Sequence, residues 1–431
     1  MTGKLTSAQL LTMTLLVCCN QLATAQDSMV YVDHQINEDS CNNYVPSERT
    51  CGPGTDTAFA SIQAAADRAR PGIRVLIQPG TYHGGIIVRR GGNESAPVIF
   101  QATGPGVIIE GSGNRRDAFF ISEANYVQID GLVVQNANRA GLRISLSDHV
   151  KISNSVFRDN GSWGVFTDFS NYTLVENCEA SGSATQHGIY ISNSSDNPTI
   201  RGNRIHGNAG AGLHMNGDAS MGGDGLVSYA LVENNVIYEN GRRGASGINL
   251  DGVTHSIIRN NLLYENHASG ISLYRIDGAD HSHSNQVLNN TIVNGRFSRW
   301  ALNMPSTENN RVFNNIILNN NRFRGSILVH IPVGEGFESD YNIVMDSFSL
   351  EGGQNRSLSL ASWQELGYDQ NSQISDVRDL FVNWSRDNYQ LSPDSPAIDR
   401  GIALENVISD IEGTARPVNG AVDIGAFEFS P

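Results

Sequence analysis

The sequence predicts an all-β fold, a right-handed parallel β-helix whose rungs each contain three short strands. Two periodic signals and the composition support this prediction. Glycines open short strands in successive repeats, and asparagines recur in a second series, most steps being about 23–26 residues long. The 431 residues include 44 glycines but only 17% charged residues, which suits the many turns of a β-solenoid. The glycines are Gly141, Gly164, Gly188, Gly212, Gly247 and Gly270, and the asparagines are Asn154, Asn177, Asn203, Asn235, Asn261, Asn290 and Asn315.

Strand alternation in residues 187–274 predicts which side chains face outward. Apolar residues alternate with polar or aromatic ones, so one strand face is expected to be buried and the other exposed. If the glycines are in register, the inward residues Ile189, Leu213, Ile248 and Ile271 share one column. Two outward columns follow, one of Tyr190, His214 and Asn249, the other of Ser192, Asn216, Asp251 and Tyr274.

The N-terminal residues 1–25 are typical of a secretory signal peptide. Lys4 gives a positive start, an apolar stretch follows, and Ala23-Thr24-Ala25 is a small-residue cleavage site. No later run is long and apolar enough to span a bilayer. We therefore expect a secreted or periplasmic protein with no membrane span.

Residues 26–72 are expected to form an N-terminal loop and a capping helix. Export favours a disulfide between Cys41 and Cys51, closing a loop without secondary structure of its own. The helix is expected over residues 57–70, with Thr57 as N-cap, covering the open apolar end of the first rung. Cys178 is expected on a strand, as a buried apolar filler.

The parallel β-helix is expected over residues 73–346, and the C-terminal tail 347–431 is expected to pack on the solenoid. Residues 360–367 have the pattern of a short helix. Two rungs are longer than the rest, with insertions at 217–228 and 275–285 that leave the same corner. Insertions on one edge of a solenoid usually build its binding face.

The net charge of −15 excludes a general nucleic-acid binder. It also gives no long-range attraction for an acidic polymer, so such a substrate needs a local basic patch. A monomer is expected.

Two segments resemble secreted right-handed β-helix proteins that act on carbohydrates, among them alginate lyases and chondroitinase-B-like lyases. The first is FASIQAAADRARPGIRVLIQPGTYHGGIIV with the following APVIFQATG; the second is the tail, with WQ, SPAIDRG and DIGAFE. The resemblance implies a secreted β-helix and a polysaccharide substrate rich in uronic acid. The lysine base of those lyases has no counterpart, because the only lysines are Lys4 and Lys151. The paired aspartates of polygalacturonase-type hydrolases and the Asp-Pro-His motif of mannuronan epimerases are also unmatched.

The outward columns supply candidates for acid–base chemistry on a uronic acid. His214 is the expected base because imidazole titrates near neutral pH. Tyr190 or Tyr274 is the expected acid, and Asp251 is expected to orient His214. The substrate carboxylate must also be neutralised, which arginine and asparagine can do. The expected substrate-binding residues are Asn216, Asn249, Arg275, Arg243 and His187.

These candidates favour a lyase that cleaves an alginate-like polysaccharide by β-elimination. Three alternatives stay open: a glycoside hydrolase, a C5 epimerase on the same scaffold, and a non-catalytic glycan-binding β-helix. A hydrolase needs two carboxyl groups across the scissile bond, for which Asp251 with Asp168 or Asp277 is the obvious supply. No cofactor is assigned. Calcium is a possible ligand: Asp218 and Asp224 in the first insertion are candidates for it, and Asp277, Asp280, His281 and His283 in the second are candidates for a metal.

Overall fold

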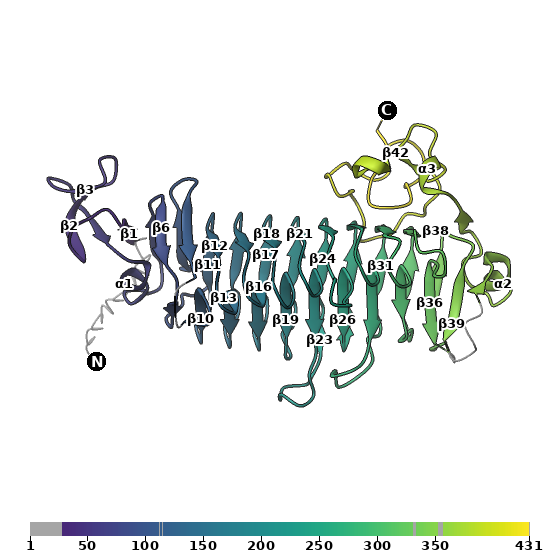
Figure 1. The fold of residues 1–431 in the computed structure, drawn as a ribbon, viewed down its shortest axis with the longest axis horizontal. Helices are drawn as coiled ribbons and strands as arrows, with labels where there is room; N and C mark the ends of the chain where they lie inside the picture. Colours follow the sequence, from purple (N-terminus) through teal and green to yellow (C-terminus); the bar gives the residue numbers. More distant parts are fainter. Residues whose placement is uncertain (1–27, 112, 114, 331–332, 352–356, 431) are drawn as a thin grey trace, which may run out of the picture.

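The structure is a computed structural model that describes residues 28–430, except 112, 114, 331–332 and 352–356. It is a parallel β-solenoid whose three long sheets run side by side along one axis (Figure 1). Each full rung contributes one strand to each sheet, as expected. The signal peptide predicted for residues 1–25 lies outside the described residues.

Sheet A has 15 strands among the described residues and starts at the N-terminal cap. In chain order its strands are β1 (Ser28–Val32), β2 (Ser40–Val45), β3 (Thr50–Cys51), β4 (Asp56–Phe59), β5 (Ile73–Ile77), β8 (Val98–Ala102), β11 (Val127–Asp130), β14 (Lys151–Ser153), β17 (Leu174–Glu176), β20 (Thr199–Arg201), β24 (Leu231–Glu233), β28 (Ile257–Arg259), β31 (Gln286–Leu288), β34 (Arg311–Phe313) and β37 (Glu338–Asp340).

Sheet B has 12 strands in the described part of the chain, and the C-terminal tail packs on it. They are β6 (Gly80–His83), β9 (Val107–Glu110), β12 (Val133–Gln135), β15 (Val156–Arg158), β18 (Glu179–Ser181), β21 (Arg204–His206), β25 (Val236–Tyr238), β29 (Leu262–Tyr264), β32 (Thr291–Asn294), β35 (Ile316–Asn319), β38 (Ile343–Val344) and β41 (Gln373–Ile374).

Sheet C also has 12 described strands and carries the candidate site. They are β7 (Ile86–Val88), β10 (Phe119–Ser122), β13 (Ala140–Ser145), β16 (Trp163–Asp168), β19 (Ile189–Ser192), β22 (Leu213–Asn216), β26 (Ile248–Asp251), β30 (Ile271–Tyr274), β33 (Leu302–Met304), β36 (Ile327–His330), β39 (Phe348–Glu351) and β40 (Ser357–Leu358). Two small sheets pair β23 (Val227–Ser228) with β27 (Val253–Thr254), and β42 (Phe381–Asn383) with β43 (Asn388–Leu391).

The apolar column of sheet C is placed as the alternation predicts. Ile189, Leu213, Ile248 and Ile271 are direct partners on successive strands, and all four are fully buried. Because a slip of one residue would turn the whole strand inside out, this column fixes what faces outward.

An asparagine ladder runs along the turn between sheets A and B. From Asn203 to Asn342, each side-chain Nδ2 donates to the Oδ1 of the asparagine one rung further on, at 2.9–3.1 Å. The same side chains also bond to buried backbone groups, which would otherwise lack partners inside the coil. The ladder residues are Asn203, Asn235, Asn261, Asn290, Asn315 and Asn342.

Two asparagines of the predicted series do not belong to this ladder. Asn154 and Asn177 lie one residue earlier, in the left-handed conformation with φ of 51° and 53°. Ser155 and Cys178 take the ladder position there, and the Cys178 N–H donates to the Asn203 Oδ1 at 2.9 Å. Cys178 is buried as expected, but it lies in a turn and not on a strand.

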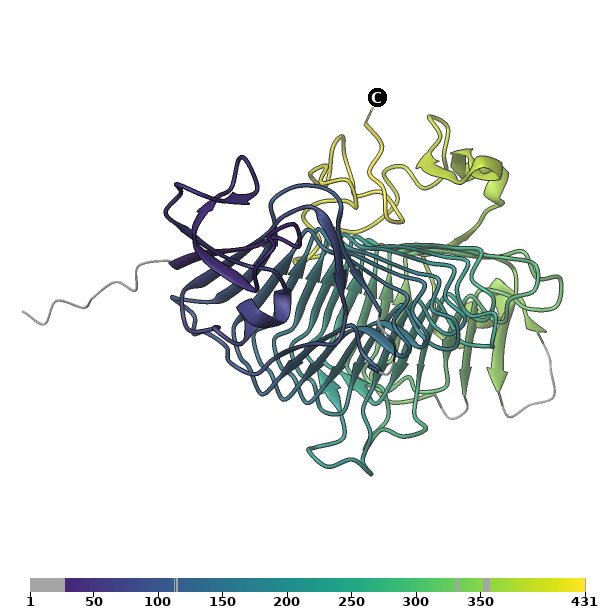
Figure 2. The same cartoon turned by 60° about the vertical axis from the view of Figure 1, so that its left-hand side comes forward.

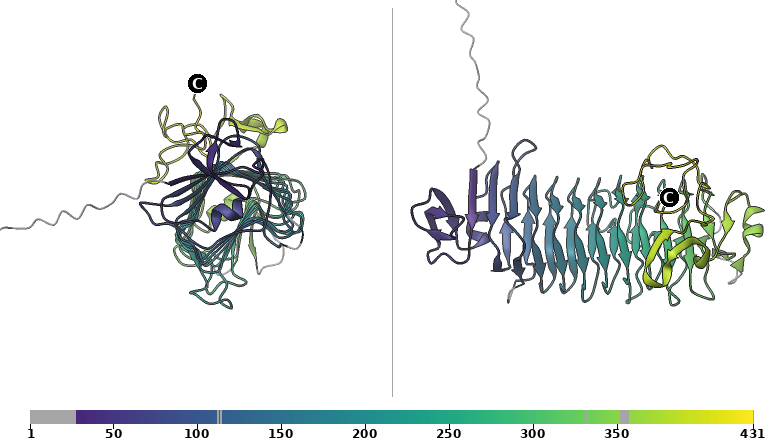
Figure 3. Two further views of the ribbon diagram at one scale, coloured as in Figure 1. Left: turned by 90° about the vertical axis from the view of Figure 1, so that its left-hand side faces the viewer. Right: turned by 90° about the horizontal axis from the view of Figure 1, so that it is seen from above.

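The capping helix is shorter than predicted. Helix α1 spans Ile62–Ala66, and its N-cap is Ser61, whose Oγ accepts the N–H of Ala64 at 3.2 Å. The start predicted at Thr57 is wrong because β4 occupies that segment and pairs with β1 and β2. Helix α1 still covers the end of the solenoid, as the end-on view shows (Figure 3, left), and its buried side chains join the main core.

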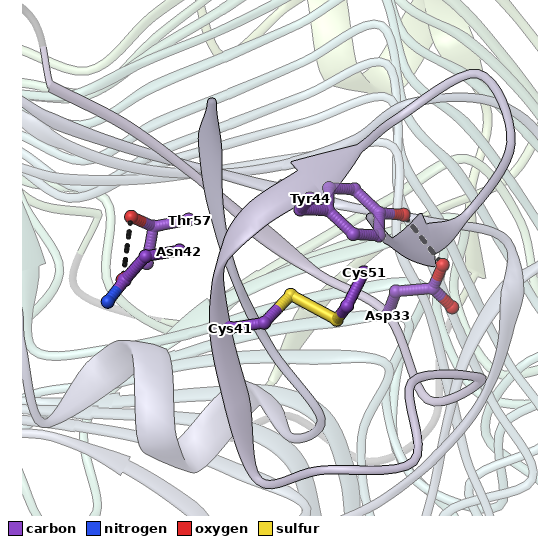
Figure 4. Close-up of a disulfide and its surroundings, with 6 residues drawn as sticks. All are labelled: Asp33, Cys41, Asn42, Tyr44, Cys51 and Thr57. Carbon is purple, nitrogen blue, oxygen red and sulfur yellow. Dashed lines mark hydrogen bonds between the residues drawn. A yellow bond between two sulfur atoms is a disulfide. The ribbon is translucent and has the colours of Figure 1, made fainter. Parts of the chain in front are cut away.

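The predicted disulfide between Cys41 and Cys51 is confirmed, with the two Cα atoms 6.2 Å apart (Figure 4). The expectation that this loop lacks secondary structure is wrong, because the bond joins the antiparallel strands β2 and β3. Beneath them, buried Asp33 accepts hydrogen bonds from the Tyr44 hydroxyl at 2.6 Å and from the Arg49 guanidinium.

The C-terminal segment both closes the coil and covers sheet B. Helix α2 (Leu360–Gln364), expected from the sequence, places Trp363 against Phe348 at the end of the core, with ring centres 5.0 Å apart. Helix α3 (Val377–Leu380), the 3-10 helix η1 (Trp384–Arg386) and the strands β42 and β43 follow, and the chain then folds over sheet B (Figure 2). Tyr264 of β29 meets Tyr389 of the tail there.

The sheets extend past both ends of the expected solenoid, 73–346. Strand β1 already pairs with β5, and β39 continues sheet C beyond residue 346. Over the residues described, no helix is long and apolar enough to cross a membrane.

Candidate functional site

Both predicted outward columns exist on sheet C. Tyr190, His214 and Asn249 are direct partners on β19, β22 and β26, and Ser272 of β30 continues the column. The second column is Ser192, Asn216, Asp251 and Tyr274 on the same four strands. Adjacent rungs bring these side chains about 4.8 Å apart.

The first column is aromatic toward the N-terminal end of the solenoid. Trp163 stacks on Phe166 at 4.5 Å, Phe166 on Tyr190 at 5.3 Å, and Tyr190 on His214 at 5.0 Å between ring centres. His187, from the turn before β19, lies 4.6 Å from the His214 ring. The imidazole of His214 is therefore packed between rings and held in one orientation.

The expectation that this face is exposed is wrong for most of the column residues. His214 is only 9% exposed and Asp251 only 1%, and Ser192 and Asn216 are also buried. Stacked rings cover His214 from the side, and the two insertions cover Asp251. The side chains face outward from the coil, but neighbours from adjacent rungs remove them from water.

The two insertions leave the same edge of the solenoid, beside β23, as expected (Figure 1). They also bond to each other: the Ala219 N–H donates to the Asp277 carbonyl, and the Ala279 N–H to the Gly225 carbonyl, both at 3.0 Å. They therefore form one wall beside the outward columns.

Asp251 holds this wall in place. Its carboxylate accepts the backbone N–H groups of Ile276, Asp277 and Gly278 at 2.8, 3.0 and 3.2 Å. It makes no hydrogen bond to His214 in the described part of the chain, so its expected role in orienting that imidazole is not what the geometry shows. The Asn249 backbone takes that place.

The environment of His214 favours the neutral imidazole. Its Nδ1 lies 2.9 Å from the Asn249 carbonyl oxygen, which can only accept, and 3.2 Å from the Asn249 side-chain Nδ2, which can only donate. We assign the proton to Nδ1, because the carbonyl oxygen is nearer and Nδ2 already donates to the Tyr274 hydroxyl at 2.5 Å. Burial lowers the pKa of His214, and the Asn249 carbonyl and the charge of Asp251 oppose that shift only in part. The second nitrogen, Nε2, then holds a lone pair, and no described residue hydrogen-bonds to it. This is the state a general base requires.

His187 has the opposite tautomer. Its Nδ1 accepts the Ala211 N–H at 2.9 Å, so the proton of the neutral ring sits on Nε2. Burial, and then the neighbouring His214, hold the pKa of His187 well below its usual value. Two imidazoles in contact cannot both carry charge at low cost, which further favours a neutral His214.

The two tyrosines each accept a hydrogen bond from an asparagine amide. Asn249 Nδ2 donates to the Tyr274 hydroxyl at 2.5 Å, and Asn216 Nδ2 donates to the Tyr190 hydroxyl at 3.4 Å. Burial raises the pKa of Tyr190 to about 12. Burial and the charge of Asp251 raise the pKa of Tyr274. Both hydroxyls thus keep their protons and can donate them, as a general acid must.

A groove of about 790 Å³ adjoins the outward columns on sheet C. Asn249 and Tyr274 line one end of it, and Ser272 and Asn303 continue the outward column along its floor. His281 and His330 also line it, with Trp300. Four arginines reach it from turns and from the second insertion: Arg243, Arg275, Arg299 and Arg324.

These four arginines lie together without an acid among the described residues that line the groove. None of the four forms an ion pair with a described residue, and the described lining holds no carboxylate. Some arginines elsewhere on the solenoid do pair with acids, as Arg143 does with Asp168 and Arg259 with Glu233. A chain with net charge −15 thus keeps one groove with unpaired positive charge.

Of the predicted binding residues, Asn249, Arg243 and Arg275 line the groove, whereas His187 and Asn216 do not. Sequence reasoning missed Arg299, Arg324, Asn303 and His330. One signal was available: Arg299 and Arg324 each lie three residues before the strand that opens a rung on sheet C.

The calcium expected at the two insertions stays a prediction. Across the described ranges no three His, Cys, Asp or Glu side chains converge. The acids of the insertions serve their own turns: Asp218 accepts the Ser220 N–H and Asp224 the Leu226 N–H. No step is assigned to calcium here.

Solved structures share this fold. The pectate lyase Pel9A aligns with a TM-score of 0.61 and 17% identity, covering 95% of this chain and 98% of that one. An alginate lyase from Paenibacillus sp. str. FPU-7 aligns with a TM-score of 0.51 and 20% identity, over 67% of this chain and 94% of that one. At these identities the likeness shows the fold alone.

Among curated sequences, the uncharacterized protein YwoF of Bacillus subtilis (strain 168) is 26% identical over 184 residues, 42% of this chain. The match spans about a third of that protein, 32% of its length. The sequence model described as a right-handed β-helix region matches residues 85–222 and 215–337, more than half of the chain. The protein therefore belongs to the right-handed β-helix family.

Proposed function

We propose that this protein is a polysaccharide lyase that cleaves a uronic-acid polymer by β-elimination. The observation that carries the proposal is a groove of four arginines that form no ion pair with a described residue, with no carboxylate in its described lining. Tyr274 lines this groove, and so does Asn249, whose carbonyl oxygen contacts His214. Two proteins of the same fold are named a pectate lyase and an alginate lyase, which supports an acidic substrate.

The arginines are assigned the first requirement of the reaction. The proton on C5 of a uronic acid is only weakly acidic, because removing it puts negative charge next to a carboxylate. Arg243, Arg275, Arg299 and Arg324 offer guanidinium groups that bind the carboxylate and stabilise the charge that develops on it.

The base and the acid are assigned to the two ends of one hydrogen-bonded unit. His214 Nε2 takes the C5 proton, and the electron pair of the C5–H bond forms the C4–C5 double bond. The C4–O bond breaks, and the leaving oxygen receives the Tyr274 proton. Water then carries the proton from His214 back to Tyr274. Asn249 holds both groups, His214 through its carbonyl and Tyr274 through its amide.

The geometry supports hydrolysis less well than elimination. It needs two carboxyl groups across the scissile bond. The described groove lining has none, and the carboxylate of Asp251 is bound to three backbone N–H groups.

The test is to incubate the protein with alginate, polymannuronate, glucuronan, pectate and chondroitin, reading ultraviolet absorbance and reducing ends together. Elimination raises both signals, because it leaves a double bond conjugated with the carboxylate. Rising reducing ends with flat absorbance would show a hydrolase and refute the proposal. A changed proton NMR spectrum with both signals flat would show a C5 epimerase, and binding alone would show a non-catalytic β-helix.

We also propose that the protein works outside the cytoplasm, as a monomer. The disulfide between Cys41 and Cys51 supports export, because such bonds persist in oxidising compartments. Cell fractionation and light scattering of the native protein test the two statements.

A further inference from the structure

A second cavity lies between the solenoid and the C-terminal tail. Its volume is about 350 Å³, within the range of small-molecule sites. The turn after β32 contributes to both cavities: Arg299 and Trp300 line the arginine groove, and Phe297 and Ser298 line this one. The tail supplies Trp384 from the opposite side. The two cavities are therefore neighbours around one corner of the coil.

Two aromatic rings give this cavity apolar surfaces. The Phe297 side chain is 72% exposed, and the Arg296 guanidinium lies 4.4 Å from its ring centre. Trp384 packs partly against the apolar cluster under the tail. A large ring left this exposed on a turn contributes little to the core, but it offers a flat face to a ligand.

The polar groups of the cavity are balanced in charge, unlike those of the groove. The lining holds one carboxylate, Glu265, one guanidinium, Arg296, and one imidazole, His267, with the amides of Asn266 and Asn320. Burial lowers the pKa of His267, which favours its neutral form. No described residue hydrogen-bonds to the Glu265 carboxylate, although burial raises its pKa. Gly295 leaves room for it, because a Cβ there would lie 2.5 Å from Glu265 Oε2.

We infer that this cavity binds a neutral sugar residue of the polysaccharide whose uronic acids occupy the arginine groove. Planar carboxylate, amide and guanidinium groups hydrogen-bond to neighbouring hydroxyls, and aromatic faces cover the C–H surface of a pyranose. The cavity has no excess of positive charge to attract a uronic acid, because Glu265 offsets Arg296, whereas the groove holds four arginines and no carboxylate among its described lining residues. The cavity and the groove therefore select different sugars. The inference rests on the proposed function for its polymer, and it makes that polymer a mixed one.

The test compares two polymers by titration calorimetry: glucuronan, made of uronic acid alone, and the rhamnogalacturonan backbone, which alternates a uronic acid with a neutral sugar. All proteins carry Tyr274→Phe to prevent cleavage. We expect Trp384→Ala and Phe297→Ala each to weaken rhamnogalacturonan binding about 10-fold, the effect of losing one stacked ring. Binding of glucuronan should not change.

The matched control is Phe323→Ala. Phe323 is 75% exposed and lies under Arg322 one rung further on, but it does not line this cavity. It should bind both polymers like the parent. The Phe297→Ala variant should fold normally, because the Phe297 ring lies outside the core, so a loss of binding in this variant cannot be due to misfolding. Unchanged rhamnogalacturonan binding in both variants would overturn the inference, and so would equal losses on both polymers. Ring-dependent binding, with no ultraviolet absorbance from any polymer when the protein retains Tyr274, would refute the lyase and support the cavity.

Discussion

Replacing His214 with alanine should lower both turnover and stability, and the structure gives a size for each effect. As the general base, His214 is expected to contribute about 100-fold or more to turnover. Its removal also leaves the Asn249 carbonyl without the Nδ1–H donor, at about 1–3 kcal/mol. The rings of Tyr190 and His187 lose a stacking partner, at about 0.5–1.5 kcal/mol for each pair. The free energy of unfolding should therefore fall by about 2–6 kcal/mol.

Phe166→Ala separates the two effects. Phe166 belongs to the same stack of rings, two rungs from His214. It is 9% exposed and stacks on Trp163 and Tyr190. It should lose a similar amount of stability but retain most of its activity, because it touches neither Asn249 nor the groove. Urea unfolding and initial rates on the cleaved polymer measure both quantities. An active His214→Ala variant, or a Phe166→Ala variant as inactive as it, would refute the assignment of His214 as base.

Three further predictions test the rest of the site. Tyr274→Phe should lower kcat by about 100-fold while KM stays nearly constant, since it removes the acid's proton but leaves the ring; a normal kcat would exclude Tyr274 as the acid. Arg299→Met with Arg324→Met should lower kcat/KM on polyuronate by about 10-fold or more, whereas Arg201→Met, whose arginine already pairs with an acid, should not. The rate should fall as the pH drops through the lowered pKa of His214, below its usual 6.5, because the base is then protonated. It should not fall on the alkaline side until well above pH 10, where Tyr274 loses its proton. A loss of rate that begins above pH 7 as the pH is lowered would contradict this.

The strand positions of the site were predictable because a solenoid repeats its backbone. A residue at a fixed offset from a strand-opening glycine must lie directly above its counterpart one rung away. Tyr190, His214 and Asn249 were therefore placed in one column from the sequence alone, and the register confirms it. The same rule failed for Asn154 and Asn177, because a one-residue difference in a turn changes which residue faces the core.

Exposure was not predictable from alternation. Period-two patterning separates the inside of the coil from the outside, but it says nothing about what lies over the outside. His214 is buried because Tyr190 and His187 happen to carry rings on the neighbouring rung and turn. Asp251 is buried because the second insertion folds back onto it. Both effects depend on contacts between rungs or loops, which a single strand pattern does not contain.

The arginine groove could not be predicted from the sequence for a related reason. Its arginines come from turns and an insertion, where length varies from rung to rung: Arg243 lies five residues before its strand, but Arg299 and Arg324 lie three before theirs. Variable turns have no fixed offset, so their side chains cannot be assigned to columns. A β-helix can thus keep its strands in strict register for stability and change its turns freely. If the proposed function is right, the strands of this protein hold the proton-transfer groups, whereas the turns choose the polymer that reaches them.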